Sequence, residues 1–144
     1  MAEITAQQKD FITERAQGCC EYCWSELKFS SDPFSIEHII PLSKGGTYDL
    51  DNLALSCQGC NNRKYNHLEA YDPIDGKLAV LYHPRQQSRS EHFVWSDDFT
   101  EMIGISPSGR ATIIRLQLNR EGVVNLRRVL KASDLHPPLK KSIS

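Results

Sequence analysis

The sequence lacks any long apolar run, and this absence excludes one class of protein at once. No stretch of 18 or more apolar residues occurs, so no segment has the length expected of a transmembrane helix. The first residues, MAEITAQQKDFITERAQG, are charged and amphipathic, without the apolar centre of a secretory signal. We therefore expect a soluble, cytoplasmic protein with no membrane partner.

A strong net charge is also missing, and so are internal repeats and low-complexity segments. The formal charge of the 144 residues is −1, which excludes a globally basic protein but is compatible with a local basic patch. Residues 1–71 hold 6 Lys or Arg against 10 Asp or Glu, whereas residues 72–144 hold 11 against 8. The two parts therefore carry −4 and +3, so composition alone does not argue for nucleic acid.

The cysteines are odd in number, five, which argues against a disulfide framework in a cytosolic chain. Cys20 and Cys23 form one CxxC pair, and Cys57 and Cys60 form another after 33 intervening residues. Four thiolates can form the tetrahedron that structural zinc prefers, although small buried hydrophobic residues are the alternative. Cys19 in place of Cys20 would give a CxxxC pair, and the two-residue spacing favours Cys20. Such a closed site leaves no coordination position for chemistry, so catalysis must lie elsewhere.

Periodicity and turn residues divide the chain into short elements. The first part is expected to form a helix capped by Thr5, a strand, a long loop, a second strand and a helix. The second part is expected to form three strands and two helices, followed by a disordered end, HPPLKKSIS. In that order, the elements of the first part lie at 5–17, 34–40, 41–52, 53–56 and 58–70. The three strands of the second part lie at 77–83, 91–96 and 101–106, and its two helices at 107–118 and 121–133.

One stretch, SIEHIIPLSKGG at residues 35–46, places a charged pair inside an apolar run. Period-2 alternation puts Glu37 and His38 on opposite faces of an ideal strand. Both can reach one site only if the strand end twists or the following loop wraps back. Pro41 and the two glycines that follow allow such a path.

Together these segments, C-x2-C, EHIIPLSKGG and DNLALSCQGCNNRK over residues 20–64, resemble the HNH endonuclease family of the four-cysteine, zinc-stapled type. The resemblance implies an α+β fold: a ββα-metal (His-Me finger) core with structural zinc, an N-terminal helix and a C-terminal strand-and-helix extension. LYHPR, HFVW and SPSGRATI are similar to the extension of uncharacterised bacterial HNH proteins and imply no chemistry. We expect a nuclease domain at 1–71, an α+β extension packed on it at 72–136 and a tail at 137–144.

The resemblance also implies roles for individual residues. His38 matches the general base that activates water, and Asn52 matches the asparagine that holds the loop and orients that histidine. Glu37 and Asn61 match the two ligands of a catalytic divalent ion, Mg²⁺ or Mn²⁺, and oxygen ligands suit such a hard cation. The family more often has aspartate where Glu37 stands. The extra methylene shifts the carboxylate by about a bond length, which can alter metal preference or lower activity.

Basic residues near this motif are the candidate nucleic-acid contacts. Arg63 and Lys64 follow Asn61 on the expected helix and could contact phosphates, and Lys44 stands beside the glycine pair. A solvated helix face or an exposed loop explains the same residues. The same two readings apply to a row of basic residues in the second part: Arg110, Arg115, Arg120, Arg127, Arg128 and Lys131.

The leading interpretation is a metal-dependent endonuclease that hydrolyses phosphodiester bonds of DNA, most simply double-stranded. The alternative is a non-catalytic, zinc-stabilised nucleic-acid-binding module, in which glutamate at position 37 has inactivated the catalytic site. A zinc-stabilised interaction domain without nucleic acid is a more distant third. The oligomeric state and the preferred catalytic metal are not readable from the residues.

Overall fold

The N-terminal helix begins at a capping box. In the computed structural model, which describes residues 4–139, α1 runs from Ala6 to Arg15. The Thr5 side chain accepts a hydrogen bond from the Gln8 amide, and the Gln8 side chain accepts one from the Thr5 amide. This reciprocal pair satisfies donors that a helix start leaves unpaired. The expected helix at 5–17 is confirmed, with ends that differ by one or two residues.

A two-stranded antiparallel hairpin follows, formed by β1 (Ser35–His38) and β2 (Leu53–Ser56). Glu37 pairs with Ala54, and His38 pairs with Leu53. The intervening loop contains two short 3-10 helices, η2 (Leu42–Lys44) and η3 (Leu50–Asn52). Strand β2 has the predicted bounds, whereas β1 is shorter than the predicted 34–40.

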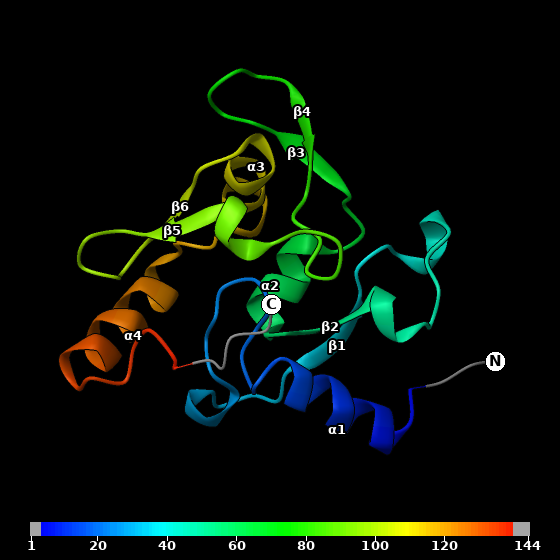
Figure 1. Cartoon of the computed structure of the whole chain (residues 1–144), viewed down its shortest axis with the longest axis horizontal. Helices are drawn as coiled ribbons and strands as arrows, with labels where there is room; N and C mark the ends of the chain where they lie inside the picture. Colours follow the sequence, from blue (N-terminus) through cyan, green and yellow to red (C-terminus); the bar gives the residue numbers. More distant parts are fainter. Residues whose placement is uncertain (1–3, 140–144) are drawn as a thin grey trace.

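Two helices cover opposite faces of this hairpin (Figure 1). On one face, Ile12 and Ala16 of α1 share a core with Leu53 and Leu55 of β2. On the other lies α2 (Gln58–Lys64), which follows directly from the second strand. Strand, strand and helix therefore form the ββα arrangement that the resemblance implies, and the α+β fold class is confirmed.

The prediction of a helix over 58–70 is wrong in its second half. Tyr65 has φ 48° and ψ −117°, a conformation that interrupts helical hydrogen bonding, so α2 ends at Lys64. Residues Glu69–Tyr71 instead form β3, which pairs with β4 (Leu78–Val80). Gly76, with φ +72°, provides the left-handed position in the turn between them.

The second part of the chain completes the fold with one more hairpin and two helices. Strand β5 (Phe93–Trp95) pairs with β6 (Met102–Gly104). Helix α3 (Pro107–Leu116) begins as predicted, with Ser106 as N-cap and Pro107 at the first position, and α4 (Glu121–Ala132) follows it. Figure 1 shows α3 between the β3–β4 and β5–β6 hairpins, and it also contacts α2.

A shared core joins this second part to the cysteine pairs. The four paired cysteines and Tyr22 belong to the same buried cluster as side chains from β4 onward: Leu81, Tyr82, Phe93, Met102, Ala111, Leu116, Leu118 and Val123. The division of the chain between residues 71 and 72 stays a prediction, and β3 spans that point.

The expected disorder of HPPLKKSIS is wrong at its first residue. His136 is buried and hydrogen-bonds through Nε2 to the Phe99 carbonyl at 2.8 Å. Residues 140–144, which complete the predicted tail, lie outside the described residues. Within residues 4–139, no helix has the length and apolar character needed to cross a membrane.

Candidate metal centre and active site

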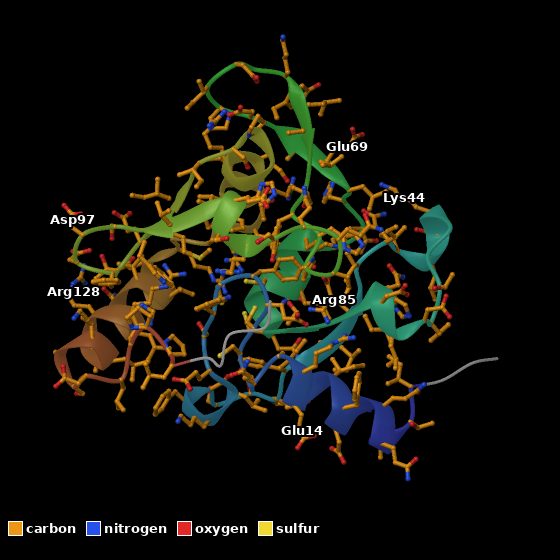
Figure 2. The ribbon with its side chains drawn as sticks, in the orientation of Figure 1. Glu14, Lys44, Glu69, Arg85, Asp97 and Arg128 are labelled. Carbon is orange, nitrogen blue, oxygen red and sulfur yellow. The ribbon has the colours of Figure 1, made fainter. Side chains whose placement is uncertain are left out.

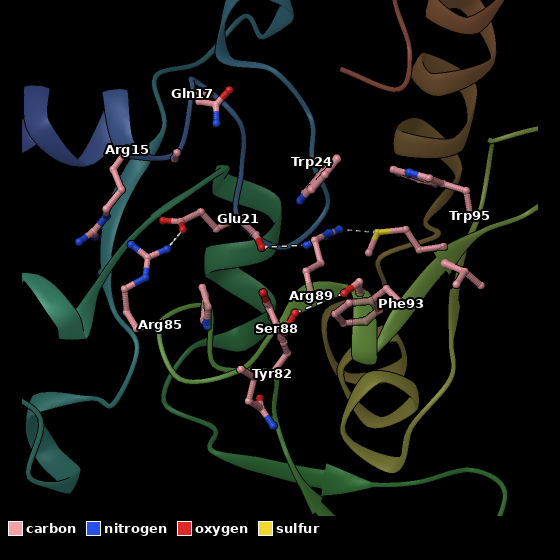
Figure 3. Close-up of a pocket in the computed structure, with 16 residues that line it drawn as sticks. Arg15, Gln17, Glu21, Trp24, Tyr82, Arg85, Ser88, Arg89, Phe93 and Trp95 are labelled. Carbon is pink, nitrogen blue, oxygen red and sulfur yellow. Dashed lines mark hydrogen bonds and ion pairs between the residues drawn. The ribbon is translucent and has the colours of Figure 1, made fainter. Parts of the chain in front are cut away.

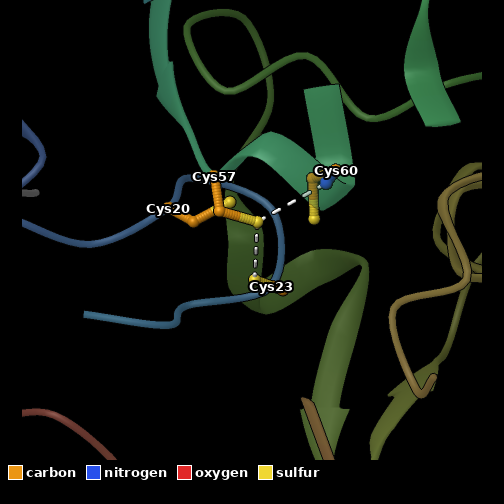
Figure 4. Close-up of side chains that lie close together, drawn as sticks. All are labelled: Cys20, Cys23, Cys57 and Cys60. Atoms are coloured by element: carbon orange, nitrogen blue, oxygen red, sulfur yellow. Dashed lines mark hydrogen bonds between the residues drawn. The ribbon is translucent and has the colours of Figure 1, made fainter. Parts of the chain in front are cut away.

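Four cysteine side chains converge at one point, as predicted from their spacing (Figure 4). The sulfur atoms of Cys20, Cys23, Cys57 and Cys60 all lie within 4.8 Å of one another, and Cys23 Sγ is 3.7 Å from Cys57 Sγ. A tetrahedron with Zn–S bonds of about 2.3 Å has edges of about 3.8 Å. The cluster therefore has dimensions that fit zinc, and it includes Cys20 rather than Cys19.

Local backbone structure sets the positions of these cysteines. Cys57 is the N-cap of α2, where its sulfur accepts a hydrogen bond from the Cys60 amide at 3.4 Å. The first pair lies in a tight turn in which the Trp24 amide bonds the Cys20 carbonyl and the Cys20 amide bonds the Ser25 carbonyl. A helix start and a turn thus present two thiols each to the same volume.

Two arginines from the second part of the chain support the cysteine cluster, and the sequence did not reveal them. Arg120 donates to Cys60 Sγ at 3.5 Å and to Cys57 Sγ at 3.4 Å. Arg127, only 3 % exposed, donates to the Cys23 carbonyl at 3.1 Å. Four thiolates around Zn²⁺ leave a net charge of −2, which an adjacent guanidinium partly offsets.

These contacts correct both readings for half of the basic row in the second part. Arg120 and Arg127 point inward, and Arg110 forms an ion pair of 2.7 Å with the buried Asp72. These three residues form neither a DNA-facing surface nor a solvated face, whereas Arg115, Arg128 and Lys131 are exposed and both readings still apply to them. No signal in the sequence could identify these contacts, because each joins residues at least 38 positions apart.

Glu37 lies on the α2 side of the hairpin and is only 5 % exposed. The Tyr22 hydroxyl donates to Oε1, and Lys64 Nζ lies 3.6 Å from Oε2. Burial raises the pKa of this carboxyl group, although the ammonium of Lys64 acts in the opposite direction. Both carboxylate oxygens therefore have partners within the protein.

Lys64 requires a correction, because it was expected to contact phosphates. It is 1 % exposed, and its Nζ donates to the Ile39 carbonyl at 2.7 Å as well as approaching Glu37. Burial lowers its pKa, which Glu37 opposes. The side chain connects α2 to the hairpin and does not reach the surface.

This arrangement does not fit a divalent ion at Glu37. The Lys64 ammonium already lies beside the carboxylate, and like charges repel. Asn61 is partly exposed on α2, and no hydrogen bond links its side chain to Glu37 among the described residues. Within residues 4–139, the four cysteines are the only group of three or more His, Cys, Asp or Glu side chains close enough to hold a metal.

His38 faces the opposite side of β1, toward α1. Its ring meets the Tyr48 ring edge-on, with centroids 4.7 Å apart and planes at 86°. Nε2 is buried and has no hydrogen-bond partner among the described residues. Burial lowers the pKa of this histidine, so the imidazole is neutral at pH 7 and able to accept a proton.

A cavity of about 780 Å³ adjoins this histidine. Lys9 and Thr13 of α1 and Tyr48 of the β1–β2 loop line it together with His38. Sequence patterns did not single out Lys9, because one lysine on an amphipathic helix looks like any solvated side chain. The structure places it as the cation of this cavity.

Asn52 holds the loop that leads away from His38. Its Oδ1 accepts from the Ile40 amide at 2.9 Å, and its Nδ2 donates to the carbonyls of Ile40 and Thr47 at 3.0 and 2.9 Å. A Cβ on Gly46 would lie 1.7 Å from the Ile40 carbonyl oxygen, so only glycine fits there. The conformation of the loop thus depends on the hydrogen bonds of the Asn52 side chain and on the absence of a side chain at Gly46.

The two remaining basic candidates differ in exposure. Lys44 is exposed in η2, beside the loop at the edge of the molecule (Figure 2). Arg63 is partly buried, and its Nη1 donates to the Gly59 carbonyl of its own helix at 3.1 Å. Only Lys44 is fully available to a partner in this conformation.

Comparison with known proteins identifies one region of the chain. Residues 20–67 match the HNH endonuclease family. The type IV methyl-directed restriction enzyme EcoKMcrA of Escherichia coli (strain K12) is 30% identical over 71 residues, covering 46% of this chain and 26% of that protein. The chain thus spans about a quarter of this relative, and no solved structure matches significantly. The chain therefore contains a region, residues 20–67 with the cysteine cluster and the ββα unit, that matches the HNH endonuclease family.

Proposed function

We propose that this protein is an endonuclease that hydrolyses phosphodiester bonds of DNA, with His38 as general base. The observation that carries the proposal is the neutral imidazole beside a cavity, with its Nε2 unpaired. A water molecule that reached Nε2 would find an acceptor for its proton. General-base catalysis of this kind contributes about 10²–10⁴-fold to rate.

The surrounding residues have positioning roles in this proposal. Tyr48 restrains the imidazole ring, and Asn52 fixes the loop that follows His38. Lys9 and Lys44 supply positive charge to a phosphate backbone, and Arg63 does so if its side chain turns outward. Double-stranded DNA as substrate and a cytoplasmic location are parts of the same proposal.

We also propose a catalytic divalent ion, Mg²⁺ or Mn²⁺, held by Glu37 and Asn61, on the condition that Lys64 moves away from Glu37. The residues do not fit the ion while Lys64 occupies the carboxylate. Metal binding there requires Lys64 to move away, and the chemistry derived above does not depend on it.

One observation favours the second candidate, a non-catalytic zinc-stabilised module that binds nucleic acid. Glu37 is fully satisfied by Tyr22 and Lys64, as a structural residue would be. In that case the hairpin and α2 form only a scaffold, and His38 contributes no chemistry.

Cleavage of supercoiled plasmid separates the two candidates. Purified protein is assayed with EDTA and then with Mg²⁺, Mn²⁺ or Zn²⁺, beside His38→Ala and the matched control His67→Ala. His67 does not line the His38 cavity. We expect nicking that falls by about 10²-fold or more in His38→Ala and persists in His67→Ala. Binding without cutting under every condition would support the module instead.

A further inference from the structure

A second cavity, of about 670 Å³, lies between the first cysteine turn and the segment from Tyr82 to Trp95 (Figure 3). It shares no lining residue with the cavity beside His38. Small-molecule sites usually have volumes of about 300–1,000 Å³. Neither the zinc cluster nor the proposed general base explains this cavity.

Aromatic side chains form one end of this cavity. Trp24 and Trp95 meet edge-on, with ring centroids 6.3 Å apart, and Phe93 and Tyr82 continue the wall. The guanidinium of Arg89 lies 4.4 Å from the Trp24 ring centroid. Its amino groups bond the carbonyls of Glu21 and Tyr22 at 3.0 and 2.9 Å, so the wall is held rigidly.

Positive charge dominates the other end. Figure 3 shows the side chains of Arg15 and Arg85 next to each other, with the Glu21 carboxylate paired to Arg85. This end holds two arginines and one glutamate, a balance of +1, and Arg89 in the aromatic wall brings the whole lining to +2. Arg85 Nη1 is buried and has no acceptor among the described residues. A buried donor without a partner calls for an acceptor, which an anionic ligand would supply.

We propose that this cavity binds one nucleotide, with the base against the aromatic wall and the phosphate at Arg15 and Arg85. Bases stack on aromatic and guanidinium planes. Both Nη atoms of Arg15 donate to backbone carbonyls and Arg85 Nη2 is paired with a carboxylate, so the phosphate would accept from the two unpartnered buried donors, Arg15 Nε and Arg85 Nη1. The base must be free of its neighbours, either as a mononucleotide or turned out of a strand. The proposal goes beyond cleavage and does not depend on it, because His38 lies outside this cavity.

Intrinsic fluorescence tests the proposal directly, because the chain has two tryptophans and both line the cavity. The full chain is titrated with deoxyadenosine monophosphate, deoxyadenosine and inorganic phosphate, in buffer without added divalent ions. We expect saturable quenching by the nucleotide and at least about tenfold weaker binding of either part alone. Equal affinity for phosphate alone would overturn the proposal, because the aromatic wall would then contribute nothing.

Two variants locate the binding. Arg85→Lys keeps a cation beside Glu21 but loses the planar fork, and we expect about tenfold weaker binding of the nucleotide. Arg128→Lys is the matched control, since Arg128 is exposed on α4 (Figure 2) and should have no effect. Trp95→Leu should bring the affinity for nucleotide down to that for phosphate. Thermal melting confirms that each variant is folded, and unchanged binding in both cavity variants would contradict the proposal.

Titrations with DNA strands distinguish a free mononucleotide from a nucleotide that is turned out of a strand. A single-stranded oligonucleotide and a duplex are titrated against His38→Ala, and deoxyadenosine monophosphate is added as competitor. Competition supports a nucleotide turned out of the strand, whereas binding of the mononucleotide alone supports a free ligand. If no nucleotide or strand quenches the tryptophans, the proposal fails. The His38→Ala variant lacks the proposed general base, so this binding experiment gives the same answer whether or not the wild-type protein cleaves DNA.

Discussion

The two faces of the β1–β2 hairpin differ in how completely they are filled. On the α2 face, Glu37 has two partners and both oxygens are occupied. On the α1 face, His38 has an unpaired Nε2 and a cavity of about 780 Å³ beside it. Neighbouring residues of one strand therefore serve opposite purposes, because alternation sends their side chains to opposite sides.

This difference indicates that the residues that stabilise the fold and the residues proposed to act in catalysis lie on opposite faces of the hairpin. The filled face combines the cysteine cluster, a buried ion pair and a shared core, and disruption of any of these three should lower the stability of the fold. The hollow face carries groups whose removal leaves no buried charge behind. Variants of the partnered residues on the α2 face should therefore change folding, and variants of the residues around the His38 cavity should change activity.

Loss of a cluster cysteine should have the largest effect on the filled face. Cys57→Ser removes one thiolate and a helix cap, and structural zinc sites contribute about 10–16 kcal/mol of binding energy that becomes folding energy. We expect a chain that retains no zinc and shows no cooperative melting. Zinc content and circular dichroism measure this, and Cys19→Ser is the control. A folded, zinc-loaded Cys57→Ser would contradict the prediction.

Removal of the Lys64 ammonium should have the next largest effect. Lys64→Met leaves Glu37 buried beside no cation, and breaking a buried ion pair costs about 3–5 kcal/mol. The measurement is the free energy of unfolding in denaturant.

The control for this experiment is the double variant Glu37→Gln with Lys64→Met. It should recover most of the lost free energy, because no charge remains unpaired. A single variant as stable as the wild type would show that Lys64 is not paired with Glu37 in solution.

Arg120 should have a smaller effect, on zinc rather than on folding alone. Arg120→Gln removes the donors to Cys57 and Cys60, and loss of partners of metal ligands typically costs about 10–100-fold in metal affinity. Competition with a chromophoric zinc chelator measures the affinity. Arg128→Gln on the neighbouring helix is the control, and equal zinc retention in both would exclude a role for Arg120.

The smallest effect concerns the hollow face and pH. Burial lowers the pKa of His38 from its ordinary value of 6.5, so its neutral form persists below pH 6.5. The acid limb of cleavage should then have its midpoint below pH 6.5. Stability should fall slightly in the same range, because the unfolded chain takes up that proton more readily. A pH–rate profile and an NMR titration of the ring test both, and a midpoint above 6.5 would contradict this.

Sequence patterns predicted the parts of the fold that depend on local residues. The CxxC spacing identified the cluster, and the run LALS at 53–56 matched β2. Ser106 and Pro107 marked the start of α3 correctly. These succeed because turn, cap and alternation preferences are set within a few positions.

The patterns failed where distant contacts decide. The helix over 58–70 was extended too far, because the left-handed Tyr65 has no sequence signature. Lys64 was assigned to the surface, yet its partner Ile39 lies 25 positions away. For the candidate site, the residues of the motif were identifiable but not the occupation of Glu37 by Lys64, which only the packing of α2 on the hairpin reveals.

The arginines that reach the cysteine cluster have a consequence for how this protein could be rearranged. Arg120 and Arg127 belong to the second part of the chain but complete the surroundings of a cluster formed by the first. A gene fragment ending near residue 71 would encode the matched family region without those donors. We therefore expect that residues 20–67 cannot be transferred alone to another protein. A fusion or domain exchange that preserves the cysteine cluster should include the C-terminal helices.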